Sequence, residues 1–101
     1  MEHLKQHLDR QYNPAPLSGM DATVRLKIGS GSLTFHTDGG QLTWCEAEPD
    51  WTIILSSETT AHALFEGAAN PIDLFMQGEL RSTGYIVATF RVLQAFIPTG
   101  R

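Results

Sequence analysis

The sequence predicts an α+β fold, in which helices pack over one face of a mostly antiparallel sheet. In residues 23–56, short runs that alternate apolar and polar residues are separated by turn residues, as is typical of strands. After Ser57 the apolar residues recur at intervals of three and four, as is typical of amphipathic helices. Helices that come mostly after the strands indicate two layers packed around one core.

The composition is that of one small globular domain. The chain has 101 residues, of which 42% are hydrophobic and 18% are charged, and its net charge is −4. Such a length leaves room for a single core. Because its seven Lys and Arg residues are scattered, we expect no nucleic-acid partner. The acidic balance also disfavours electrostatic docking on an anionic membrane.

Cysteine usage and hydropathy predict a cytoplasmic protein. The single cysteine, Cys45, excludes an internal disulfide and a cysteine-based zinc site. The N-terminus lacks the basic and apolar regions of a signal peptide, and no apolar run is long enough to span a bilayer. We therefore expect no stable membrane insertion.

Residues 1–21 are predicted to form a helix and a linker, and residues 22–101 the main domain. In "EHLKQHLDRQY", Leu4 and Leu8 lie one turn apart in an otherwise polar helix, which therefore has little to bury. "NPAPLSGMD" ends this helix, because it contains two prolines and a glycine.

Four strands are predicted next, in "TVRLKI", "SLTFHT", "QLTWCEA" and "WTIILS". Each places its large apolar residues mainly on one face, which indicates a sheet with one face in water. "DGG" at residues 38–40 is a good hairpin signal, because such turns need residues that tolerate positive φ. The short turns predict an antiparallel meander.

Two short helices follow this meander. Ser57 can cap the first, and Asn70 followed by Pro71 is a typical start for the second. The buried side of the second helix is expected to consist of Ile72, Phe75 and Met76.

The end of the chain is predicted to hold a fifth strand and the longest apolar helix. "GELRST" is an edge strand with Leu80 as its apolar anchor, and Gly84 lets the chain turn. The helix over residues 85–97 ends at Pro98. Its buried stripe is expected to consist of Ile86, Val87, Phe90, Leu93, Phe96 and Ile97.

Reactive side chains are few. His3 and His7 lie one turn apart and could share a metal, but no third ligand is apparent nearby, so a solvated helix face is the favoured interpretation. Cys45 and His36 could form a nucleophilic pair on one hairpin. Glu46 next to Cys45 disfavours the thiolate that this chemistry needs. We therefore expect no enzyme, no metal and no cofactor.

The stretch "NPIDLFMQGELRSTGYIVATFRVL" resembles the C-terminal half of the sterol carrier protein type 2 family. The family pattern has an Asn/Asp-Pro, a Phe followed by an apolar residue, a strand between two glycines, and an apolar helix. Its positions here are Pro71, Phe75, Met76, Gly78, Leu80, Gly84 and the helix from Tyr85. "DWTIILSSETTAHALFEGAANP" is similar too, so the resemblance is specific from Asp50 onward.

The resemblance implies a five-stranded, mostly antiparallel sheet with an apolar tunnel between sheet and helices. It also implies a non-enzymatic carrier of fatty acids, sterol-like molecules, phospholipids or polyprenyl-quinone precursors, in a bacterial cytosolic protein. Because "GELRSTG" replaces the more basic "GKLKIKG" common in the family, acyl-CoA is a less favoured ligand. The expected tunnel lining is Leu64, Phe65, Phe75, Met76, Leu80, Ile86, Val87, Phe90 and Leu93.

Two other hypotheses remain open. The same apolar residues could simply pack a closed core, in a module that docks on a lipid-metabolic or ubiquinone-biosynthetic enzyme through the last helix or the sheet edge. An enzyme that uses Cys45 and His36 is the third hypothesis. The N-terminal helix could also be exchanged with a second copy, which would give a homodimer.

Overall fold

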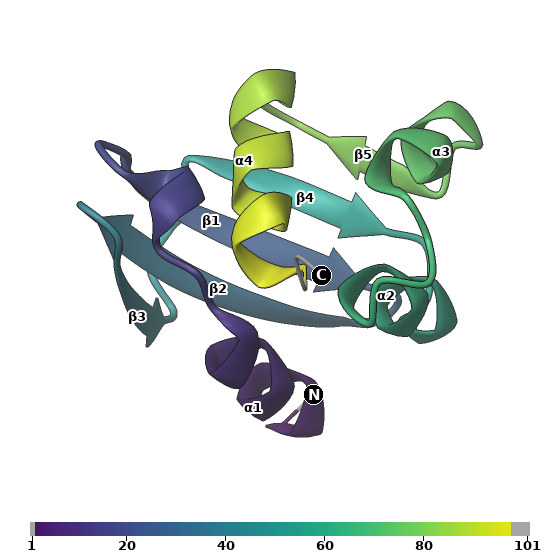
Figure 1. Cartoon of the computed structure of the whole chain (residues 1–101), viewed down its shortest axis with the longest axis horizontal. Helices are drawn as coiled ribbons and strands as arrows, with labels where there is room; N and C mark the ends of the chain where they lie inside the picture. Colours follow the sequence, from purple (N-terminus) through teal and green to yellow (C-terminus); the bar gives the residue numbers. More distant parts are fainter. Residues whose placement is uncertain (1, 98–101) are drawn as a thin grey trace.

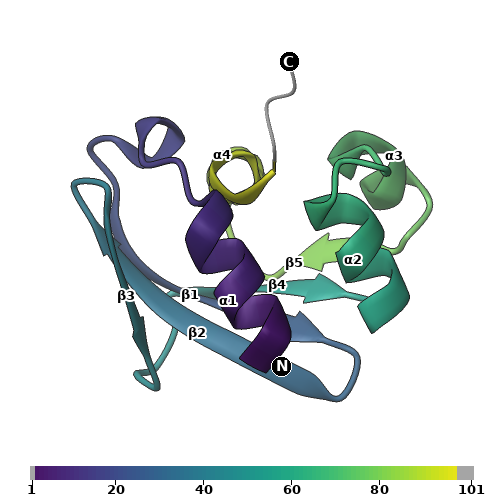
Figure 2. The ribbon, with the colours of Figure 1, turned by 60° about the horizontal axis from the view of Figure 1, so that its bottom comes forward.

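The computed structural model describes residues 2–97 of the chain (Figure 1). Its helices are α1 (Glu2–Gln11), α2 (Glu58–Phe65), α3 (Pro71–Met76) and α4 (Ile86–Phe96), with a short 3₁₀ turn η1 (Ala15–Leu17). Its strands are β1 (Asp21–Ile28), β2 (Gly31–Asp38), β3 (Gln41–Cys45), β4 (Trp51–Leu55) and β5 (Leu80–Ser82). Figure 2 shows all four α-helices on the same side of the sheet. The predicted α+β class is confirmed.

The five strands form one mixed sheet in the order β3-β2-β1-β4-β5. Strands β1, β2 and β3 are joined by antiparallel hairpins, as predicted, and β5 pairs antiparallel with β4. Strand β4, however, pairs in parallel with β1. The predicted four-strand meander is therefore wrong at its last strand, whereas the five-stranded, mostly antiparallel sheet is confirmed.

Asp50 fixes the crossover that brings β4 beside β1. Its backbone N–H donates to the carbonyl oxygen of Thr23 at 2.7 Å. Its carboxylate Oδ2 accepts the Thr23 N–H at 2.8 Å. Both backbone groups of one β1 residue are thereby paired with the residue that precedes β4. Alternation along a strand shows which face a residue takes and not which strand lies beside it, so the sequence pattern could not reveal this pairing.

Helix α1 belongs to the core, although little burial was expected of it. Leu4 and Leu8 are both buried in the same cluster as the inner face of the sheet. The side-chain amide of Gln11 donates to the carbonyl oxygen of Phe65 at 2.9 Å and to that of Phe96 at 2.7 Å. These carbonyls end α2 and α4, so one amide joins the C-terminal ends of two helices and offsets their missing backbone partners. The expectation of a weakly packed helix is wrong.

The predicted turns and helix caps are confirmed, but Gly84 is required for a reason other than the predicted one. Ser57 and Asn70 cap α2 and α3 through their side chains. Gly39 and Gly40 have positive φ in the β2–β3 turn. Gly84, in contrast, is required for close packing: a Cβ there would lie 2.5 Å from the Cβ of Trp51. Contact with this large ring explains the glycine.

Candidate functional site

His36 has partners other than Cys45. Its Nε2 lies 2.9 Å from Oδ1 of Asp21, and its Nδ1 lies 2.9 Å from Oγ1 of Thr23. Cys45 is paired across the ladder with Thr34. Because both ring nitrogens are engaged elsewhere, the Cys/His nucleophile is not assembled.

The structure offers no centre for a metal in the part of the chain that it describes. Residues 2–97 contain no group of three or more His, Cys, Asp or Glu side chains placed to hold a metal ion. His3 and His7 therefore find no third ligand within this range. Helices long and apolar enough to cross a membrane are likewise absent from the described residues.

The nine predicted lining residues fall into two groups. Leu64, Phe65, Leu80 and Leu93 are completely buried, and no water-sized space adjoins their side chains. The other five lie toward the surface on α3 and α4. The rings of Phe75 and Phe90 meet edge to face, with centroids 6.1 Å apart, and Phe90 in turn packs against the buried core. The lining as a whole stays a prediction, because no tunnel is open at the four buried side chains.

The exposed large hydrophobic side chains of the described residues lie on two segments of the chain. All of them belong to α3, to the N-terminal turn of α4 or to the residue before it, with exposed fractions of 38–79%. We call this set the α3–α4 apolar surface; it consists of Ile72, Phe75, Met76, Tyr85, Ile86 and Val87. The contact between Phe75 and Phe90 joins the two segments, and large apolar side chains in water often mark a binding site.

Helix α3 does not bury the side that the sequence predicted. Leu74 is its buried residue, whereas Ile72, Phe75 and Met76 face solvent. A helix of six residues with four large apolar side chains cannot bury them all against one layer. The excess of large apolar residues on α3 is visible in the sequence, but the pattern alone predicts that they are buried.

Helix α4 is also rotated from its predicted stripe. The buried residues include Thr89 and Val92, while Ile86 and Val87 are exposed. The hydroxyls of Thr89 and Ser82 lie 2.7 Å apart, which turns the Thr89 face toward β5. Arg91 donates from its guanidinium to carbonyl oxygens near η1, on another side of the helix. These polar contacts set the rotation of a helix that is apolar on several sides.

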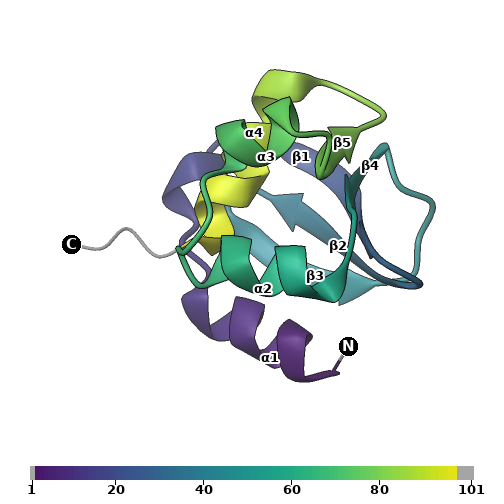
Figure 3. The same ribbon diagram turned by 90° about the vertical axis from the view of Figure 1, so that its right-hand side faces the viewer.

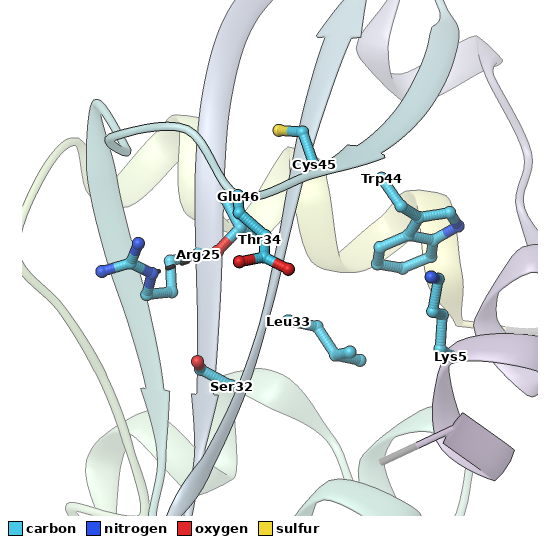
Figure 4. Close-up of a pocket in the computed structure, with 8 residues that line it drawn as sticks. All are labelled: Lys5, Arg25, Ser32, Leu33, Thr34, Trp44, Cys45 and Glu46. Carbon is cyan, nitrogen blue, oxygen red and sulfur yellow. Dashed lines mark hydrogen bonds between the residues drawn. The ribbon is translucent and has the colours of Figure 1, made fainter.

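A separate hollow lies at the other edge of the sheet, with a volume of about 460 Å³. It forms where β3 ends, because β3 pairs with β2 only from Thr34 to Asp38. Figure 4 shows the Lys5 ammonium beside the Trp44 ring, 5.7 Å from its centroid. The lining is Lys5, Arg25, Ser32, Leu33, Thr34, Trp44, Cys45 and Glu46. It includes none of the nine predicted residues, and its charged groups do not suit a long apolar ligand.

One comparison with known proteins identifies the family. The profile described as the SCP-2 sterol transfer family matches residues 1–90. This range includes helix α1 and the first five of the eleven residues of α4. No curated protein sequence matches this chain.

Several solved structures share the fold. Palmitated SCP2L2 from Aedes aegypti is 17% identical with a TM-score of 0.64, and the match covers 99% of this chain and 93% of that one. A ubiquinone synthesis protein, UbiJ-SCP2, is 17% identical with a TM-score of 0.66, and 93% and 85% are covered. The sec-alkylsulfatase Pisa1 from Pseudomonas sp. is 14% identical with a TM-score of 0.73 over 92% of this chain. The chain spans only 16% of the sulfatase. At these identities the structures show a common fold.

Proposed function

This chain belongs to the SCP-2 sterol transfer family, and we propose that it is a non-enzymatic lipid-binding domain. Its cargo would be one long apolar molecule held between the helices and the sheet. The contact between Phe75 and Phe90 supports this most directly. Phe75 belongs to the exposed apolar surface and Phe90 packs against the core, so an apolar path leads from water to the buried side chains.

Entry of a lipid requires these two rings to separate. The free energy gained when the ligand leaves water offsets the loss of the ring contact. An aromatic pair contributes about 0.5–1.5 kcal/mol beyond its buried area. Each CH₂ group of the ligand contributes about 0.8 kcal/mol when it leaves water. A few CH₂ groups therefore offset the lost ring contact, and the rest of the chain can offset the cost of association. Helix α3 is six residues long, which makes it the natural element to move.

The charges near the site favour a small or neutral head group. Residues 28–80 contain eight acidic residues and no Lys or Arg, and Arg81, whose guanidinium lies beside Gly78, is the next cation in the sequence. Glu79, in the turn before β5, accepts hydrogen bonds from the hydroxyls of Ser56 and Thr60. Fatty acids, sterol-like molecules and polyprenyl-quinone precursors therefore suit the site better than acyl-CoA. The palmitated and ubiquinone-synthesis relatives support the same classes.

The first test is native mass spectrometry of the protein purified from cells, followed by extraction with organic solvent. A stoichiometric lipid released by solvent is the expected result, and it would identify the class of cargo. A protein of the bare sequence mass, which also fails to bind an added fluorescent fatty acid, would contradict the proposal.

The variant Phe90→Asp tests the entry path. A carboxylate at the ring contact should lower the affinity for a fluorescent fatty acid at least about tenfold, because a charge in an apolar site is costly. Gln94→Asp is the matched control, since Gln94 is exposed on the same helix. If a folded Phe90→Asp protein binds lipid as tightly as Gln94→Asp does, the path lies elsewhere.

A closed-core interaction module is the competing function. The complete burial of Leu64, Phe65, Leu80 and Leu93 favours it, because a ligand must displace packed side chains. The sulfatase comparison also favours it, since the shared fold is there one part of a longer chain. Absence of lipid from the purified protein and from the titration would support this module.

A further inference from the structure

We infer that the N-terminal turn of α4 and the indole N–H of Trp51 together bind the carboxylate of a fatty acid. The inference rests on the proposed lipid-binding function and adds where the head group of the cargo lies. Two observations on residues 2–97 support it: an N–H group that is buried without an acceptor, and a helix that begins beside it without a side-chain cap.

Trp51 carries a buried hydrogen-bond donor. The residue is 6% exposed, and its Nε1 has no hydrogen-bond partner among the residues that the structure describes. Trp51 lies on the same face of β4 as Ile53 and Leu55, which belong to the buried core under the helices. A buried N–H group without an acceptor is unfavourable, so such a group calls for a partner from outside the chain.

The N–H edge of this ring lies beside the residues that lead into α4. A Cβ atom on Gly84 would lie 2.5 Å from the Cβ of Trp51 and 3.5 Å from its Cδ1, the ring carbon bonded to Nε1. The ring of Tyr85 meets the indole edge to face, with centroids 6.3 Å apart, and an aromatic ring is at most a weak acceptor. Figure 3 shows the short connection from β5 to the start of α4, at the top of the view. The indole N–H therefore lies next to the first turn of α4.

Helix α4 begins without a side-chain cap in the described part of the chain. Tyr85 holds the N-cap position and makes no side-chain hydrogen bond to the first turn, whereas Ser57 and Asn70 cap α2 and α3. The first backbone N–H groups of a helix have no partner within the helix and favour an anion. Ile86 and Val87, in this turn, are 38% and 71% exposed, so a head group can reach these N–H groups from water.

The charges of the surrounding chain favour a single carboxylate. Residues 80–101 contain no Asp or Glu that would repel it. Asp50, the residue before the indole, directs its Oδ2 to a backbone N–H of β1 at 2.8 Å. The guanidinium of Arg81 lies beside Gly78, and that of Arg91 donates to carbonyl oxygens near η1. A phosphate usually needs such a cation in contact, whereas neutral N–H donors suit one negative charge.

The apolar tail has a path from this turn to the core. Ile86 and Phe90 lie four residues apart on one face of α4, about 6 Å along its axis. Phe90 contacts Phe75 and packs against the buried core. A carboxylate at the first turn would therefore place the next CH₂ groups on Ile86 and the rest of the tail at the entry path. Tyr85 is 75% exposed and only needs to turn away from the indole.

The first test is nuclear magnetic resonance of the isotope-labelled protein with dodecanoic acid and with dodecane. The chain has two tryptophans, so the variant Trp44→Phe identifies the indole signal of Trp51. We expect dodecanoic acid to move the indole proton signal of Trp51 downfield, because a new hydrogen bond to oxygen forms, and dodecane not to do so. An equal shift with both ligands, or no shift with bound acid, would overturn the inference.

Variants then separate the head group from the tail, with affinities measured by displacement of the neutral dye Nile red. Trp51→Phe should lower the affinity for dodecanoic acid about tenfold, because a hydrogen bond to a charged group is lost, and leave that for dodecane unchanged. Tyr85→Asp should have the same selective effect, because a carboxylate at the N-cap occupies the N–H groups of the turn. Trp44→Phe is the matched control, since the Nε1 of Trp44 already donates to Asp9. Its affinity for both ligands should equal that of the wild type.

The outcomes distinguish this inference from the lipid-binding function on which it depends. A protein that binds neither ligand contradicts both. If folded Trp51→Phe and Tyr85→Asp proteins bind the two ligands as the wild type does, or lose affinity for both alike, lipid binding stands and the position of the head group is wrong. Thermal midpoints show whether these variants are folded. If either is not, the resonance experiment on the Trp44→Phe protein decides, because it leaves Trp51 and Tyr85 in place.

Discussion

Helix α1 is mostly polar and is fixed in the core, whereas helix α3 is mostly apolar and exposes most of its side chains. Leu4 and Leu8 are the two buried residues of α1, and Leu74 is the one buried residue of α3. The difference lies in anchoring. Gln11, at the end of α1, bonds to two helix ends, and Tyr12 donates its hydroxyl to the carbonyl of Gly40 at 2.6 Å. Side-chain hydrogen bonds to backbone carbonyls of other elements therefore hold the end of α1 against the rest of the fold.

Helix α3 shows the opposite arrangement. Its cap is local, since the Asn70 side chain accepts from the Ile72 N–H within the same turn. Its packing on the sheet is mainly against β5, which has only three residues. A short helix held this way can present an apolar surface and can move without unfolding the core. We therefore expect α1 to contribute mainly to stability and α3 mainly to binding.

The largest effect is expected from removing a buried leucine of α1. Leu8→Ala should lower the free energy of unfolding by about 2–5 kcal/mol, because a fully buried side chain leaves a cavity. Ile72→Ala, on the exposed face of α3, is the comparison and should change it by less than about 1 kcal/mol. Chemical denaturation measures both. Equal losses in the two variants would remove the distinction between the helices.

The second effect concerns the amide that joins α2 and α4. Gln11→Ala should lower the free energy of unfolding by about 1–2 kcal/mol, because two hydrogen bonds to helix-end carbonyls are lost. Hydrogen exchange should speed up at the C-terminal turns of both helices. Gln94→Ala, an exposed glutamine of α4, is the control. If exchange speeds up at only one of the two helices, the amide does not couple them.

The third effect tests what sets the rotation of α4. Thr89→Val keeps the shape of the side chain and removes the hydroxyl that contacts Ser82, at a cost of about 1 kcal/mol. The double variant with Ser82→Ala should cost little more than either single variant, because both remove the same contact. Additive losses, measured by denaturation, would show that the two hydroxyls do not act as a pair.

The sequence predicts the helix caps and the β2–β3 turn correctly, but it does not predict the pairing of strands that are far apart in the chain. The caps at Ser57 and Asn70 and the turn at residues 38–40 depend on neighbouring residues, so their chemistry is visible in the sequence. The pairing of β4 with β1 depends on Asp50 and Thr23, which lie far apart in the chain. Nothing in either short segment indicates the other.

The sequence predicts the helices that carry the candidate site, but not the rotation of α4. Eight of the eleven residues of α4, "IVATFRVLQAF", are apolar, so several faces suit the core equally. The choice is made by Thr89 with Ser82 and by Arg91 with carbonyls near η1, both contacts between separate elements. The residues named for the lipid site therefore include both the packed core and the exposed surface.

The smallest effect on stability should accompany a large effect on solubility. Met76→Gln should change the free energy of unfolding by no more than about 0.5 kcal/mol, because an exposed side chain has little contact to lose. The same change removes the most exposed apolar side chain of the α3–α4 apolar surface, so it should raise the concentration at which the protein aggregates on heating. Light scattering and denaturation, run side by side, measure the two quantities. A loss of stability as large as that of Leu8→Ala would mean that Met76 is packed in solution, and the apolar surface would then be part of the core.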